Sequence, residues 1–329
     1  MAAGSLRHLA PGWYAVVMGL AGLALAWHRA VPLMGEAAGA AALAIGALAA
    51  AVFVVLATAT LWRGWKHPDA WAEDRRHPVR HVFIAALPIS VLLLATVAVA
   101  LAGPHPLLRA LWWIGSLAQL GVTWWVLARW WRAAAAGGLQ WAGVTPGLFI
   151  PIVGNVLVPL AGVPLGHAEW SAAQFGFGLL FWPVVLVLLV ARVLVQGPWP
   201  DRLAPTAFIV IAPPAVVGLA LLQFGAPPLA AWTCWGMALG SFGWSAAQAR
   251  RIVAQPFGVP HWGTSFPLAA LAALTLRLAE PGGVLAVLGP MLLALASVVI
   301  AGLALGTVRG LRNGSLLQPE TVPVATAAP

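Results

Sequence analysis

Residues that carry out acid–base, nucleophilic or metal chemistry are scarce in this chain of 329 residues. It has eight Asp and Glu residues, eight His and one Cys, Cys234. A single cysteine excludes an intrachain disulfide and a cysteine-cluster metal site, and the histidine spacings match no metal motif. The one lysine, Lys66, excludes a phosphate loop that ends in Gly-Lys-Ser/Thr. We therefore predict no catalytic residue, no metal site, no cofactor and no enzymatic activity.

The spacing that stands out belongs to four prolines, Pro88, Pro151, Pro213 and Pro267. Each lies six to eight residues from one end of an apolar segment, and the intervals between them are 63, 62 and 54 residues. Proline in a helix interior removes a backbone hydrogen bond and kinks the helix. In lipid, the freed carbonyl is tolerated only where it is buried in protein or faces water. A further segment has no proline at this depth but two glycines, Gly19 and Gly22.

These residues must be positioned by helices that span a membrane. The chain is 62% hydrophobic and 8% charged, whereas soluble domains carry about 25% charged residues. A helix needs roughly 20 mostly apolar residues to cross a bilayer. We predict ten such helices, over 13–30, 36–62, 80–102, 107–131, 145–162, 172–195, 205–224, 228–250, 260–279 and 283–308. They form a single domain over 1–315, and a disordered cytoplasmic tail follows at 316–329.

The repeated prolines predict how these helices are arranged. Their intervals are close to the length of one helical hairpin, and all four prolines lie in odd-numbered helices. Units that repeat in the same direction are related by an axis along the membrane normal. We predict an all-α membrane protein in which ten transmembrane helices form five helical hairpins in a ring, with the odd helices around a central pore.

The basic residues predict the orientation of the chain. Of 17 Lys and Arg residues, 14 fall on the side of the two termini, and Arg29, Arg109 and Arg277 fall on the other side. Because cytoplasmic loops carry an excess of basic residues, we expect both termini to be cytoplasmic. The net charge of +9 is then a topology signal, and we expect no nucleic-acid partner.

Three polar residues have two interpretations each. Arg29 and Arg277 lie at the outer ends of odd helices, where they either flank the outer mouth and attract anions or pair locally with Glu36 and Glu280. Asn155 either faces the pore or hydrogen-bonds a neighbouring helix. Because no charged residue lies at the middle of a predicted span, we expect no pump driven by protons or sodium.

Seven short segments form a collinear series, although none alone is a strong motif: 11–27, 77–89, 113–120, 151–155, 183–184, 212–213 and 262–266. Together they resemble the tellurite-resistance/dicarboxylate transporter family, which includes TehA-like bacterial proteins and plant slow anion channels. The chain departs from the bacterial pattern at Val16-Val17, at Trp182 and at Pro267, where that pattern has proline, glutamate and glycine.

The resemblance implies a homotrimer with one pore in each subunit. It also implies that a phenylalanine of the ninth helix plugs the pore, and the pattern Trp-x-x-Ser-Phe places that residue at Phe266, immediately before Pro267. The pore gate is therefore predicted at Phe266. Residues at the kinks are predicted to line the pore: Gly19, Gly22, Pro88, Pro151, Asn155, Pro213 and Pro267.

We predict a passive channel or uniporter for small inorganic or organic anions, embedded in the lipid bilayer of the bacterial inner membrane. The alternative is a carrier or exporter for C4-dicarboxylates, sulfite or tellurium oxyanions, since the family contains these as well. A membrane-embedded scaffold or enzyme is a third interpretation. It is disfavoured because the predicted spans supply no convergent His, Asp or Glu.

Overall fold

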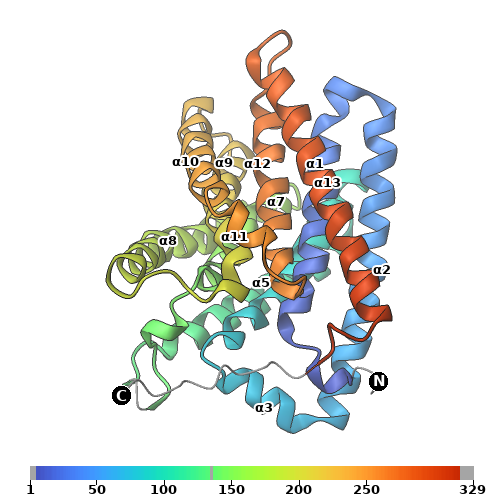
Figure 1. The fold of residues 1–329 in the computed structure, drawn as a ribbon. Coiled ribbons are helices and arrows are strands. Elements are labelled where there is room, and N and C mark those ends of the chain that lie inside the picture. The colour runs from blue at the N-terminus through green and yellow to red at the C-terminus, as the bar shows by residue number, and fades with distance from the viewer. Residues whose placement is uncertain (1–4, 134–135, 319–329) are drawn as a thin grey trace.

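A computed structural model of the chain describes residues 5–133 and 136–318, in which helices are the only regular elements. The longer α-helices are α1 (Ala15–Met34), α2 (Glu36–Lys66), α4 (Ala86–Ala102), α5 (Pro106–Ala128), α8 (Ala168–Gln196), α9 (Ala212–Gln223), α10 (Pro228–Ala246), α12 (Ser265–Leu278) and α13 (Val284–Arg312). The shorter ones are α3 (Pro68–Arg76), α6 (Phe149–Leu157), α7 (Pro159–Gly162) and α11 (Ala249–Val253). Figure 1 shows α1, α2, α12 and α13 side by side, with α3 across the bottom of the bundle.

The structure confirms the all-α class and, in part, the predicted spans. Among the described residues, seven helices are long and apolar enough to cross a membrane: Pro11–Met34, Glu36–Lys66, Arg80–Ala102, Pro106–Ala128, Ala168–Gln196, Asp201–Gln223 and Val284–Arg312. The other three predicted spans are helical but shorter or less apolar, over Pro146–Gly162, α10 and α12. The charged segment between the second and third predicted spans is not only a loop, because it contains α3.

Five α-helices are each preceded by a 3-10 segment: η2 (Pro11–Tyr14) before α1, η3 (Arg80–Ala85) before α4, η6 (Pro146–Leu148) before α6, η7 (Asp201–Ile211) before α9 and η8 (Val259–Thr264) before α12. The four spaced prolines are the second or third residues of α4, α6, α9 and α12. A proline in the first turn costs little, because its missing N–H has no partner within the α-helix. The prolines therefore mark the change from 3-10 helix to α-helix.

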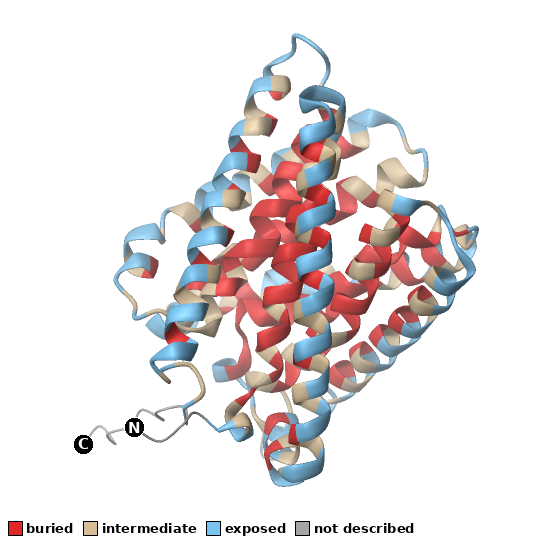
Figure 2. Cartoon of the chain, turned by 90° about the vertical axis from the view of Figure 1, so that its right-hand side faces the viewer, coloured by how far each residue is buried: buried red, intermediate tan, exposed pale blue. Residues whose placement is uncertain are grey.

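Neighbouring helices in the chain pack as pairs: α1 with α2, α4 with α5, α6 with α8, α9 with α10 and α12 with α13. Further contacts join the first members of these pairs: α1 to α4, α4 to α6, α6 to α9, α9 to α12 and α12 to α1. Buried residues gather at the centre of the molecule, and exposed residues follow the outer helices (Figure 2). Many exposed side chains of α2 and α8 are apolar, such as Val54, Val55 and Leu194, which suits a surface in lipid.

Candidate functional site

A cavity of about 420 Å³ lies among the 3-10 segments and is here called the basal cavity. Each of the five helices with a 3-10 start contributes to its lining, through Met18, Ile89, Val153, Ala212 and Phe266. The lining also includes Leu316 and Gln318 from the predicted tail, whose remaining residues 319–329 lie outside the described part of the chain. The basal cavity is therefore shared by segments from both ends and the middle of the sequence.

The lining of the basal cavity reaches only the first few residues of each of these five α-helices. Along the five helices, the last lining residues are Met18, Ile89, Val153, Ala212 and Pro267. Beyond these positions α1, α4, α9 and α12 continue as largely buried helices for several further turns. Phe266 and Pro267 are therefore the last residues of α12 that line the basal cavity.

Phe266, the predicted gate, lies in the first turn of α12 and is only 6% exposed. Its ring packs against α1 at Gly22, where an added Cβ would lie 2.9 Å from Cδ2 of the ring. One turn earlier, a Cβ at Gly19 would lie 2.3 Å from Oγ of Ser265. Because α1 runs through both glycines without interruption, their role in the structure is to let α12 approach α1 closely.

The other predicted pore residues lie outside the basal cavity lining: Gly19, Gly22, Pro88, Pro151, Asn155 and Pro213. Asn155 is fully buried, and its Nδ2 donates a hydrogen bond to Oγ1 of Thr123 on α5 at 2.9 Å. Its Oδ1 accepts one from Nε2 of Gln174 on α8 at 3.0 Å. These bonds match the alternative in which Asn155 joins neighbouring helices. That any of the six residues lines a longer pore remains a prediction.

The charged residues of the basal cavity are all basic in the described chain. Arg80 and Arg202 line it together with His8, and no Asp or Glu does so. Lining side chains whose formal charges are all positive favour anions over cations. The lining therefore suits a small anion.

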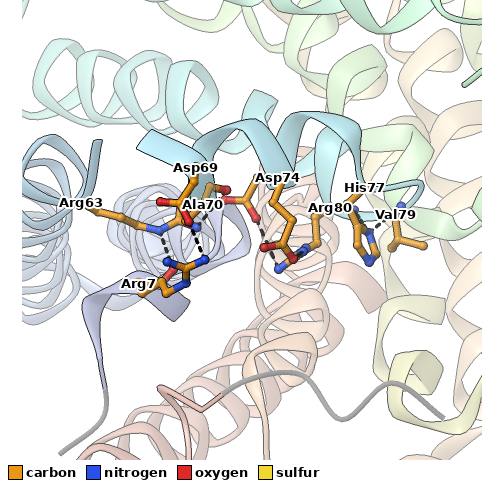
Figure 3. Close-up of polar contacts among 9 residues, drawn as sticks. Arg7, Arg63, Asp69, Ala70, Asp74, His77, Val79 and Arg80 are labelled. Carbon is orange, nitrogen blue, oxygen red and sulfur yellow. Dashed lines mark hydrogen bonds and ion pairs between the residues drawn. The ribbon is translucent and has the colours of Figure 1, made fainter. Parts of the chain in front are cut away.

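Arg80 is held by acidic residues of α3 (Figure 3). It pairs with Glu73, and its Nη1 lies 3.4 Å from Oδ1 of Asp74. The hydrogen bond from Arg80 lowers the pKa of Glu73 below its ordinary value, because it favours the charged carboxylate. The other oxygen of Asp74 lies 2.6 Å from Nη1 of Arg63 in an almost fully buried ion pair. This charge cluster, Arg63, Glu73, Asp74 and Arg80, fixes α3 against the wall of the basal cavity.

Arg29 and Arg277 lie near the opposite ends of α1 and α12 from the basal cavity. Arg277 is exposed and Arg29 half-buried, and the two are close enough to repel each other. Neither arginine forms an ion pair with another described residue, so the predicted alternative of pairing with Glu36 and Glu280 is not found. Whether they act on anions remains a prediction.

Sequence reasoning did not single out Arg80 and Arg202. Both belong to the 14 basic residues that we assigned to one side of the membrane, and residue type alone does not separate them from the other twelve. A partial signal exists, because both stand at the start of a segment that leads to one of the spaced prolines. The acidic partners on α3 were missed because no helix was predicted between the spans at 36–62 and 80–102.

These features define a multi-pass helical membrane protein whose helices enclose a cavity with apolar and basic walls. Residues 8–308 match the family described as voltage-dependent anion channel, SLAC1, and the chain belongs to this family. The family resemblance predicted from the sequence is thereby confirmed.

Three similar proteins illustrate the range of relatives. The S-type anion channel SLAH2 of Arabidopsis thaliana is 26% identical over 64% of this chain and 40% of its own length. The tellurite resistance protein TehA homolog of Haemophilus influenzae is 25% identical over 80% of this chain and 79% of its own. An uncharacterized transporter of Methanocaldococcus jannaschii is 22% identical over 82% of this chain and 83% of its own. The chain thus spans less than half of SLAH2 but most of the other two.

Proposed function

We propose that this protein conducts small inorganic or organic anions passively across the bacterial inner membrane, through a pore that Phe266 gates. The observation that carries the proposal is the position of Phe266, whose ring lines the basal cavity at the start of α12, next to the first turns of the other four helices that line it. A bulky ring at that point blocks an ion sterically, and a change of its rotamer would open the path without moving a helix. Membership of the anion channel family and the all-basic charge of the lining support this function.

The proposed pore runs along the axis of a ring of five hairpins. The helix pairs, and the closed series of contacts from α1 through α4, α6, α9 and α12 back to α1, support that arrangement. A homotrimer with one pore in each subunit, and cytoplasmic termini, complete the proposal. The orientation rests on the 14 basic residues on the side of the termini, and the basal cavity is then the cytoplasmic entrance.

Selectivity in this proposal comes from the pore's width and electric field. The described walls of the basal cavity offer two arginines at its edge and mostly apolar side chains deeper in. Such a path attracts an anion but binds it weakly, which permits rapid exit on the other side. A pump driven by protons or sodium usually needs a carboxylate inside the membrane, and no predicted span has one at its middle.

A carrier or exporter for C4-dicarboxylates, sulfite or tellurium oxyanions is the second candidate function. The name of the Haemophilus influenzae relative, which refers to tellurite resistance, favours it.

Chloride efflux from proteoliposomes tests the proposal and separates the two candidates. With valinomycin and a potassium gradient to set the voltage, a channel gives efflux that follows the voltage and does not saturate with chloride. A carrier gives saturable efflux that accelerates when a transported anion is present outside. Efflux of chloride, malate or sulfite that neither follows the voltage nor accelerates with the same anion outside, from liposomes with folded protein, would contradict both candidates.

A further inference from the structure

The two arginines that line the basal cavity differ in their electrostatic surroundings. Arg80 faces Glu73 and Asp74, and Asp74 also pairs with Arg63. The charges of this cluster, two positive and two negative, sum to zero. Arg80 therefore contributes little net field to the cavity.

Within residues 5–133 and 136–318, Arg202 has no such compensation. Its side chain is exposed, and in the described part of the chain it takes part in no ion pair or hydrogen bond. The nearest acid in sequence, Asp201, is occupied elsewhere, because its Oδ1 accepts a hydrogen bond from Nε of Arg251 at 2.5 Å. The charge of Arg202 is therefore free to act on the contents of the cavity.

The backbone around Arg202 is held in place although its side chain is free. Nη2 of Arg251 donates a hydrogen bond to the carbonyl oxygen of Trp199 at 2.8 Å, and the Trp199 side chain is buried. On the other side, Oγ1 of Thr206 donates one to the carbonyl oxygen of Leu203 at 2.6 Å. Arg202 thus projects from a fixed point at the edge of the cavity, with a long side chain that can follow a mobile ion.

We propose that Arg202 is the residue that recruits small inorganic anions into the basal cavity and sets its preference for anions over cations. A single uncompensated charge beside an apolar space raises the local concentration of counter-ions and repels ions of its own sign. This inference rests on the proposed anion conduction. It deepens that proposal by naming the positively charged side chain that acts on anions at this entrance. Arg29 and Arg277 lie at the opposite end of the helices.

The test compares Arg202→Gln with wild type in chloride efflux from proteoliposomes at about 10 mM and about 150 mM salt, where the Debye length is roughly 30 Å and 8 Å. The variant is expected to lower the initial efflux rate roughly threefold or more at low salt, and less at high salt. Arg202→Lys keeps the charge and should retain the wild-type rate. Arg250→Gln, which removes an exposed charge outside the cavity lining, should leave the rate unchanged.

Equal rates for wild type and Arg202→Gln at both salt concentrations overturn the inference while anion conduction stands. Absence of efflux from wild type instead contradicts the proposed function. A second measurement does not depend on transport: crystals soaked in bromide should show an anomalous peak beside the Arg202 guanidinium that is missing in Arg202→Gln. No peak in the wild-type cavity would remove Arg202 as an anion site.

Discussion

The ring of Phe266 on α12 packs directly against Gly22 on α1, so closely that a methyl group at Gly22 would lie 2.9 Å from Cδ2 of the ring. The same methyl group would lie 3.3 Å from Cβ of Ala269. The position of the proposed gate thus depends on a residue without a side chain in the neighbouring helix. Glycine at this point lets the ring rest at the inner end of the basal cavity.

Gly22→Ala should displace the Phe266 ring and change the anion conductance. We expect conductance between those of wild type and Phe266→Ala, because the ring no longer fits its resting place. In the double variant with Phe266→Ala, Gly22→Ala should have little further effect, since the ring is gone. A double-mutant cycle of conductances measures this coupling.

Gly39→Ala on α2 is the control for a glycine substitution, because its nearest neighbour would be in ordinary contact at 3.8 Å. Equal effects of Gly22→Ala with and without the Phe266 ring would show that Gly22 does not act through that ring.

Glu73→Gln should increase the anion flux through the basal cavity. Its carboxylate is ionised at neutral pH, since Arg80 lowers its pKa, so the substitution adds one net positive charge to a cluster that sums to zero. We expect a rise of roughly twofold at low salt that fades at high salt. Initial rates of chloride efflux check this, and a rate at or below wild type would contradict the electrostatic account of the cavity.

Breaking the buried ion pair should destabilise the protein far more than breaking an exposed one. Asp74→Asn leaves the Arg63 guanidinium buried without its counter-charge, at a cost of about 3–5 kcal/mol. For a chain of this size we expect the melting temperature in detergent to fall by roughly 10 °C.

The matched control is Asp201→Asn, which removes the partner of Arg251 in a pair whose carboxylate side chain is 63% exposed. An exposed pair contributes at most about 1 kcal/mol, so the melting temperature should fall by only a few degrees. Similar losses in the two variants would show that the Arg63–Asp74 pair does not secure α3.

Asn155→Ala should reduce stability and leave anion selectivity unchanged. The variant removes the hydrogen bonds to Thr123 and Gln174 inside the bundle, and buried groups left without a partner cost about 1–3 kcal/mol. Thermal unfolding and reversal potentials separate the two effects. A shift in the ratio of anion permeabilities would instead place Asn155 in the pore, as the other interpretation of the sequence has it.

Composition and hydropathy were sufficient to predict the helical membrane class. The four spaced prolines were predicted as kinks inside helices, and the structure places them in the first turns of α4, α6, α9 and α12 instead. What the pattern could not provide was the local geometry at those starts. Pro88 and Pro267 read as kinks inside long spans, but each follows a 3-10 segment, because a proline is compatible with the first turn of an α-helix. An apolar stretch indicates where a helix lies, but it does not indicate where a 3-10 helix changes to an α-helix.

The site was predictable only where the resemblance supplied a residue. Phe266 belongs to the lining of the basal cavity, and its role as a gate stays a prediction. Asn155 lies outside that lining and joins helices through hydrogen bonds, a role that a polar residue in an apolar helix serves as well as lining a pore. Arg202 is one of the 14 basic residues that the orientation of the chain explains equally well. Among the described residues Arg202 has no ion-pair partner, which is a property of three-dimensional contacts and leaves no mark on the sequence.

The central claim is that Phe266 closes a pore for anions at the end of the basal cavity. The most direct test is the current through planar bilayers that contain wild type, Phe266→Ala or Phe175→Ala, recorded under a chloride gradient with a large impermeant cation. Phe175 on α8 is the matched control, because it is also 6% exposed but lies outside the cavity lining.

In that measurement, Phe266→Ala is expected to raise the conductance roughly tenfold, the effect of lowering a barrier by about 1.4 kcal/mol. The reversal potential should stay at the chloride equilibrium value, and Phe175→Ala should conduct as wild type does. Unchanged conductance in folded Phe266→Ala protein, or a reversal potential away from the chloride value, would contradict the account.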